Sequence, residues 1–97
     1  MAANARVNLG LIGAGRIGKL HAENIATRIK GVRLVAVADV DRAAAEETAA
    51  RFDAPVAAAD YRRLLDDPAV EAVVVASATD THAEIVQQAA AAGKHVF

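Results

Sequence analysis

A short apolar segment that runs directly into three closely spaced glycines constrains the fold of this chain most. Residues 7–12 (Val-Asn-Leu-Gly-Leu-Ile) have the composition of a strand that is buried on both faces. Gly13, Gly15 and Gly18 follow in the spacing Gly-x-Gly-x-x-Gly, and a helical pattern begins inside them. A strand, a glycine turn and a helix start in this order predict a site for the pyrophosphate of a dinucleotide.

Each glycine has a mechanical reason in such a site. Gly13 lets the chain leave the strand through a tight turn, Gly15 lets a pyrophosphate approach the backbone, and Gly18 lets the helix pack closely on the strand. The free N–H groups of the first helical turn then face the phosphates. A bare glycine triplet also fits a flexible loop with accidental spacing, so the context has to decide.

The context includes an acidic residue at the expected distance. Residues 32–38 form a second apolar run that predicts a buried strand, and Asp39 stands at its end, 21 residues after Gly18. This distance is typical of the carboxylate that binds the adenosine ribose in dinucleotide-binding folds. The alternatives for Asp39 are a helix N-cap and a solvated turn.

Composition excludes several classes of function. The 97 residues allow one domain, and a 55% hydrophobic fraction suffices for a core although aromatic residues make up only 3%. A net charge of −1 without a basic cluster argues against nucleic acid as a partner, and the absence of cysteine excludes disulfides and thiolate metal sites. No apolar run approaches the length of about 18 residues that spans a membrane. Residues 1–6 lack a signal-peptide core, so we expect a cytoplasmic protein.

Strands and helices are predicted to alternate along the chain. The strands are expected at 7–12, 32–38, 56–58, 72–76 and 94–97, and the helices at 15–29, 42–52, 61–65 and 82–92. This alternation predicts an α/β fold, a Rossmann-like doubly wound parallel sheet in the order 3-2-1-4-5. The sequence stops before the end of such a domain, so residues 1–97 are expected to be an incomplete Rossmann domain.

Two local patterns make more detailed predictions. Bulky residues recur at helical spacing in the first helix and predict an inner side of Ile17, Leu20, Ile25 and Ile29, with Ala22 and Ala26 filling in. Thr81 and Glu84 have the spacing of a capping box, which predicts that the last helix begins near His82.

The polar loop Ser77–Asp80 follows the strand that is expected beside the first strand. It should therefore line the same crevice as the glycine turn. Hydroxyl groups in this loop can bind the pyrophosphate or the nicotinamide ribose, and the alternative is that they only cap the following helix.

Four segments together carry a resemblance to a known family: Gly13–Ala22, Val35–Asp41, Ala76–His82 and Gly93–Phe97. They resemble the glucose-fructose oxidoreductase, inositol dehydrogenase and rhizopine catabolism (Gfo/Idh/MocA) family, and most closely its inositol 2-dehydrogenase branch. Many members of the family have Thr-Pro-Asn where this chain has Ser77 to Asp80, and the Thr-Asp-Thr-His sequence at 79–82 resembles that of inositol dehydrogenases.

The resemblance implies an NAD-binding or NADP-binding Rossmann domain and assigns contacts to it. The glycine turn with Arg16 and Ile17 would hold the pyrophosphate, Asp39 the adenosine ribose, and the loop from Ser77 to His82 would border the cofactor. The implied cofactor-binding residues are Gly13, Gly15, Arg16, Ile17, Gly18, Asp39, Arg42, Ser77, Ala78, Thr79 and His82. We expect NAD rather than NADP, because the carboxylate of Asp39 would repel a 2′-phosphate, although Arg42 could meet one.

The resemblance also implies an activity that needs more than these residues. A complete member would oxidise a ring hydroxyl of a polyol or sugar, here myo-inositol, and pass the hydride to the nicotinamide. The family's catalytic lysine lies in a Glu-Lys-Pro stretch after the strand matching 94–97, and a second domain supplies an Asp/His pair and the substrate pocket. We therefore expect no catalytic residue and no metal ligand here, and an inactive chain on its own.

The histidines do not change this expectation. His82 could reach the crevice, whereas His21 and His95 are interpreted as structural. The open edge beside the last strand predicts a homo-oligomer. The alternative functions are a non-catalytic dinucleotide-binding module that works with a partner chain, and a site for a flavin or another adenine cofactor.

Overall fold

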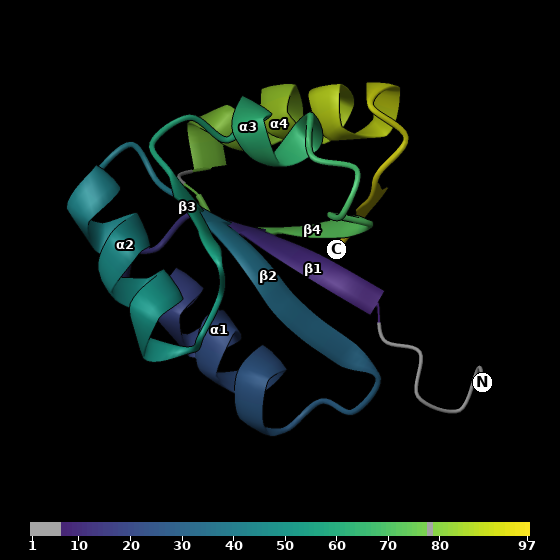
Figure 1. The fold of residues 1–97 in the computed structure, drawn as a ribbon. Helices are drawn as coiled ribbons and strands as arrows, with labels where there is room; N and C mark the ends of the chain where they lie inside the picture. The colour runs from purple at the N-terminus through teal and green to yellow at the C-terminus, as the bar shows by residue number, and fades with distance from the viewer. Residues whose placement is uncertain (1–6, 78) are drawn as a thin grey trace.

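The computed structural model describes residues 7–77 and 79–97, which form a parallel five-stranded sheet with helices on both faces (Figure 1). The strands are β1 (Val7–Ile12), β2 (Val32–Ala38), β3 (Val56–Ala58), β4 (Ala72–Val75) and β5 (His95–Val96). They lie in the spatial order β3-β2-β1-β4-β5. The predicted doubly wound sheet and its 3-2-1-4-5 order are confirmed.

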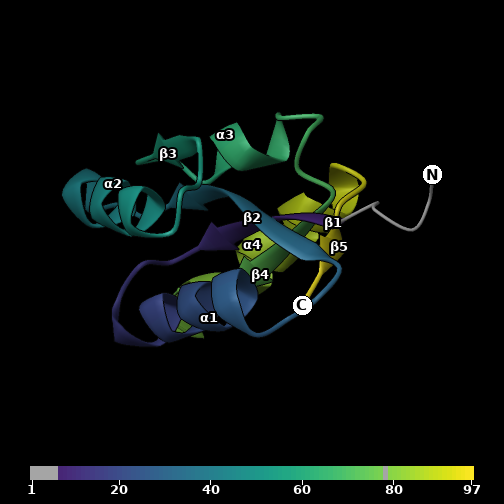
Figure 2. The ribbon, with the colours of Figure 1, turned by 60° about the horizontal axis from the view of Figure 1, so that its bottom comes forward.

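The helices form two layers, one on each face of the sheet. Helices α1 (Arg16–Thr27) and α2 (Arg42–Arg51) cover one face, and α3 (Arg62–Leu65) and α4 (Thr79–Ala91) cover the other (Figures 1 and 2). The buried side chains divide accordingly. One cluster includes Leu9, Leu11, Ala22, Ile25, Leu34 and Val37, and the other includes Ile12, Val35, Leu64, Val73, Ile85 and Ala89.

The inner side of α1 agrees with the prediction in part. Ala22 and Ile25 are buried as predicted, and with Gly18 they form one stripe at spacings of four and three residues. The prediction is wrong for the other four residues, because Ile17, Leu20 and Ile29 are 57%, 54% and 50% exposed and Ala26 is exposed as well. Gly18 and Ala22 allow the helix to lie close to the sheet, and Ile17 and Leu20 lie outside this contact.

The start of α4 also differs from the prediction. The helix begins at Thr79, three residues earlier than expected, so Thr81 lies inside its first turn and is not the N-cap of a capping box. The remaining helices and strands begin and end within two residues of the predicted positions.

The sheet topology indicates at which edge of the sheet a ligand would bind. All strands run in the same direction, so the segments that follow β1, β2, β3 and β4 emerge at a common edge. The chain moves outward from β1 to β2 and β3, and then returns to β4 on the other side of β1. Ligands of doubly wound sheets bind at such a reversal of strand order.

Candidate functional site

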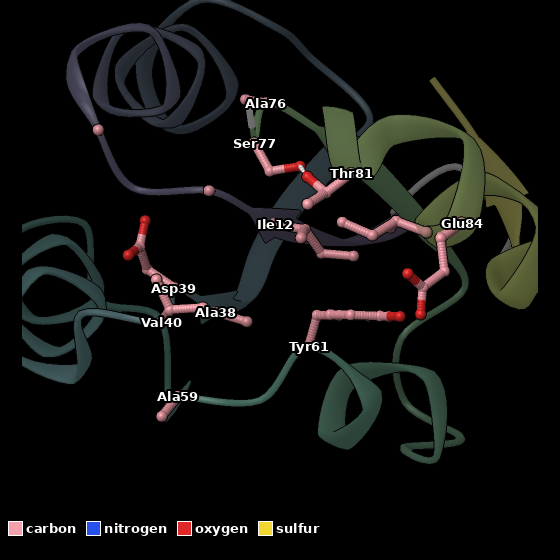
Figure 3. A pocket seen from close by; sticks show the side chains of 13 residues that line it. Ile12, Ala38, Asp39, Val40, Ala59, Tyr61, Ala76, Ser77, Thr81 and Glu84 are labelled. Atoms are coloured by element: carbon pink, nitrogen blue, oxygen red, sulfur yellow. Dashed lines mark hydrogen bonds between the residues drawn. The ribbon is translucent and has the colours of Figure 1, made fainter. Parts of the chain in front are cut away.

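A pocket of ≈ 340 Å³, which we call the crevice, opens at this reversal point (Figure 3). Its walls come from the segments that follow the first four strands and from α4. The glycine turn and Asp39 lie at one end, and Tyr61 and Glu84 lie at the other. Ser77 is also a lining residue, so the structure brings the glycine turn and the loop after β4 together as predicted.

Gly13 and Gly18 are required by the packing of the protein itself. Gly13 has a φ of 105°, and a Cβ there would lie 2.6 Å from the carbonyl carbon of Ala76. A Cβ on Gly18 would collide with the carbonyl oxygen of Gly13. These two glycines therefore allow the turn to form and α1 to begin directly beside β1.

Gly15 is different, because none of the residues that the structure describes requires it to lack a side chain. Its φ is −75°, which any residue can adopt, and a Cβ at this position would meet no atom within 4 Å. Gly15 is the N-cap of α1, and the first helical turn contains no acidic residue. The open space therefore lies against a helix N-terminus whose first N–H groups have no partner within the helix. Such a site fits the pyrophosphate of a dinucleotide.

Asp39 is fixed beside the glycine turn by two backbone hydrogen bonds. Its Oδ2 accepts from the N–H of Ala14 at 2.7 Å, and its Oδ1 accepts from the N–H of Asp41 at 2.8 Å. Each carboxylate oxygen can accept a further hydrogen bond, so the two oxygens can together bind the two hydroxyls of a ribose. The N-cap alternative is excluded, because the side chain that caps α2 is Asp41, which accepts from the N–H of Ala44 at 3.3 Å.

Arg42 does not face the crevice in this structure. It is the first residue of α2 and forms an exposed ion pair with Glu46, with 3.3 Å between Nε and Oε2. Arg16 and Ile17 lie in the first turn of α1 with exposed side chains. Cofactor contacts of Arg16, Ile17 and Arg42 remain predictions.

The loop after β4 is tied to α4 by two side-chain interactions. Nε2 of His82 donates to the carbonyl oxygen of Ser77 at 2.6 Å, and Oγ of Ser77 lies 3.0 Å from Oγ1 of Thr81. His82 itself does not line the crevice but is hydrogen-bonded to Ser77, which does, so a cofactor contact of His82 remains a prediction. Ala78 lies outside the described residues, and Thr79 is placed as the first residue of α4, so the predicted contacts of both remain predictions.

Sequence reasoning missed several walls of the crevice. Val40 follows Asp39 at the end of β2, Tyr61 follows β3, and Glu84 and Ile85 lie on α4. Tyr61 could have been found, because β3 was predicted to end at the same edge of the sheet as β1 and β2. The two α4 residues could not be found while that helix was given a later start.

Within residues 7–77 and 79–97 no cluster of histidine and acidic side chains is arranged to bind a metal ion. None of the helices in this part of the chain has the length and apolar character needed to cross a bilayer. His21 on α1 and His95 on β5 are exposed and do not line the crevice.

Comparison with known proteins gives consistent matches over the whole described chain. Residues 7–97 match the family model GFO_IDH_MocA, described as "Oxidoreductase family, NAD-binding Rossmann fold". The chain is 48% identical to inositol 2-dehydrogenase of Acidothermus cellulolyticus over 97 residues, which is 100% of this chain and 28% of that protein. It is 42% identical to myo-inositol 2-dehydrogenase of Thermotoga maritima over 91 residues, which is 94% of this chain and 27% of that protein.

A solved structure shows the same arrangement with ligands. Myo-inositol dehydrogenase from Lactobacillus casei, in complex with NAD(H) and myo-inositol, superimposes with a TM-score of 0.89 at 33% identity. The match covers 95% of this chain and 27% of that one. The chain therefore spans a little more than a quarter of the length of the proteins it matches.

Proposed function

The chain belongs to the Gfo/Idh/MocA oxidoreductase family, and on this premise we propose that it is the NAD-binding part of a dehydrogenase that oxidises a ring hydroxyl of a polyol or sugar. The activity that fits best is that of an inositol 2-dehydrogenase, because several relatives bear that name. The proposal about substrate rests on those relatives, and the proposal about cofactor rests on the crevice.

The position of Asp39 is the observation that carries the cofactor proposal. Its carboxylate lies at the end of the crevice beside the glycine turn, held by the N–H groups of Ala14 and Asp41. A fixed carboxylate accepts hydrogen bonds from the 2′- and 3′-hydroxyls of an adenosine ribose and repels a 2′-phosphate. Arg42 does not line the crevice and forms an exposed ion pair with Glu46. These contacts support NAD over NADP.

The other residues of the crevice have distinct roles in this proposal. The backbone around Gly13, Gly15 and Gly18 and the first turn of α1 would bind the pyrophosphate, and the loop from Ser77 to His82 would border the ribose on the nicotinamide side. When bound, NAD supplies the hydride acceptor. The residues of this chain bind and orient the cofactor, and we assign none of them to proton transfer.

The rest of the catalytic machinery is proposed to lie in the part of the relatives that this chain does not match. The resemblance implies a catalytic lysine after the last strand and a second domain with the substrate pocket. Homo-oligomer formation and a cytoplasmic location remain predictions from the sequence, and the mass in solution measured by light scattering tests the first of these.

Calorimetric titration of the chain with NAD, NADP and a flavin dinucleotide tests the cofactor proposal. We expect NAD to bind more tightly than NADP and the flavin nucleotide not to bind in the same range. Tight flavin binding with no NAD binding would replace NAD by a flavin in the proposal.

The substrate proposal requires an assay of the whole gene product. NADH formation is followed with myo-inositol, scyllo-inositol and a set of hexoses as substrates, and we expect the inositols to be oxidised. NAD binding without oxidation of any polyol or sugar would favour a non-catalytic nucleotide-binding module.

A further inference from the structure

The end of the crevice opposite Asp39 contains two polar groups that the proposed contacts do not use. The hydroxyl of Tyr61 is buried and has no hydrogen-bond partner among the residues that the structure describes. In Figure 3 it points along the crevice wall toward the carboxylate of Glu84. A buried hydroxyl without a partner is unfavourable, so an interaction that satisfies it stabilises the occupied site.

The other polar groups of the crevice are already engaged. Both oxygens of Asp39 accept from backbone N–H groups, and the hydroxyls of Ser77 and Thr81 lie 3.0 Å apart. Oε1 of Glu84 accepts from Nε2 of Gln88 at 3.1 Å. A carboxylate accepts about four hydrogen bonds, so Glu84 retains capacity for donors on the crevice side.

The wall between the two ends is apolar. Ile12, Ala38 and Val40 line it on the sheet side and Ile85 on the α4 side. A ligand that fits this crevice has a hydroxylated part beside Asp39, a flat apolar part in the middle and a hydrogen-bond donor at the far end. The adenosine half of a dinucleotide has these features in this order, because the purine ring carries an amino group on the edge away from the ribose.

We propose that in the occupied crevice the hydroxyl of Tyr61 donates to the carboxylate of Glu84, which accepts a hydrogen bond from the 6-amino group of adenine and makes the crevice selective for adenine over 6-oxopurines. This inference rests on the proposed function, since it concerns the base of the dinucleotide bound there. A hypoxanthine ring presents a carbonyl oxygen in place of the amino group, and two acceptors facing each other lose the hydrogen bond and repel. Tyr61 is a positioning residue, and Glu84 contacts the base.

Calorimetric titration with NAD and with its hypoxanthine analogue tests this inference. The measured quantity is the ratio of the two dissociation constants, which cancels changes that affect both ligands equally. We expect the wild-type chain to bind NAD at least about ten-fold more tightly, as a hydrogen bond to a charged group predicts.

Variants at both positions separate base recognition from general damage. In Glu84→Gln the ratio should fall close to one, because an amide can accept from the amino group or donate to the carbonyl. In Tyr61→Phe the ratio of the two dissociation constants should move toward one, because NAD binds more weakly while the affinity for the hypoxanthine analogue changes little. The matched control Glu47→Gln removes the same charge from an exposed position on α2 that does not line the crevice, and its ratio should equal that of the wild type.

Two outcomes would overturn the inference, and only the first of them also overturns the proposed function. If the folded wild-type chain binds neither dinucleotide, the proposed function fails and the inference fails with it. If NAD binds and Asp39→Ala weakens it, but Glu84→Gln keeps the wild-type ratio, only the assignment of Glu84 is wrong.

Discussion

Replacement of Asp39 by alanine should reduce both stability and cofactor selectivity, and the structure allows each effect to be sized. The variant loses the acceptor for two backbone N–H groups, those of Ala14 and Asp41, at 2.7 and 2.8 Å. Because the side chain is half-buried, we take about 1 kcal/mol for each bond, or about 2 kcal/mol in total, which corresponds to a Tm lowered by roughly 8–16 °C in a domain of this size. Differential scanning calorimetry measures this change.

The cofactor effect of the same substitution is independent of the stability loss. NAD should bind about 10- to 100-fold more weakly, because the charged acceptor for the ribose hydroxyls is gone. The affinity for NADP should fall much less, because the variant also removes the repulsion between the Asp39 carboxylate and the 2′-phosphate. The ratio of NAD to NADP affinity, measured by calorimetric titration below the melting range, is therefore the quantity to compare.

Asp67→Ala provides the matched control for this prediction. Its carboxylate also accepts from a backbone N–H, that of Ala69 at 2.9 Å, but it precedes β4 and so lies at the opposite end of the sheet from the crevice. This variant should lose about 1 kcal/mol of stability and keep the wild-type affinity ratio. An Asp39→Ala variant that melts lower but keeps the wild-type ratio would refute the assignment of Asp39 to the ribose.

Four further substitutions test other parts of the structure. Gly15→Val should fold with a free energy of unfolding within about 1 kcal/mol of the wild type, but it should not bind NAD. Gly13→Ala should fail to fold stably. Circular dichroism measures the folding of both variants, and calorimetric titration measures NAD binding. Lys94→Met removes an ammonium group that donates to two backbone carbonyl oxygens at 2.7 and 2.6 Å, and it should lower stability by about 2 kcal/mol in urea unfolding without changing NAD affinity. His82→Phe removes the donor to the carbonyl of Ser77 and should weaken NAD several-fold, and unchanged affinity would show that this contact does not shape the crevice.

The parts of the fold that sequence reasoning predicted are those set by local chemistry. Alternating apolar runs and helical segments fix a parallel sheet, and the handedness rule for crossovers leaves few strand orders to consider. Asp39 was found because its distance from Gly18 follows from the length of one helix and one strand.

The errors share a physical cause, which is that large side chains were taken as the mark of a packed face. On α1 the face against the sheet is formed by Gly18, Ala22 and Ile25, because close approach of a helix to a sheet requires small residues. Ile17 and Leu20 are exposed for the same reason. Hydrophobic size therefore identified Ile25 on the packed face but added Ile17 and Leu20, which lie outside it.

The far wall of the crevice was missed for a different reason, because its residues come together only in the folded chain. Tyr61 follows β3 and Glu84 lies inside α4, so no spacing in the sequence connects them. The capping-box interpretation also gave Glu84 a local role that competed with any other. The structure removes that role by starting α4 at Thr79, which leaves the Glu84 carboxylate facing the crevice.

The sequence predicts a different reason for each of the three glycines of the turn, and the structure separates Gly15 from the other two in the same way. Gly13 and Gly18 are needed by the fold, because a Cβ on either would collide with the backbone of neighbouring residues. Within residues 7–77 and 79–97 nothing requires glycine at position 15, since a Cβ there would meet no atom within 4 Å. A bound phosphate close to the helix N-terminus would supply such a requirement. Loss of NAD binding in a Gly15→Val variant that folds normally would therefore locate the phosphates directly, which no substitution of Gly13 or Gly18 can do.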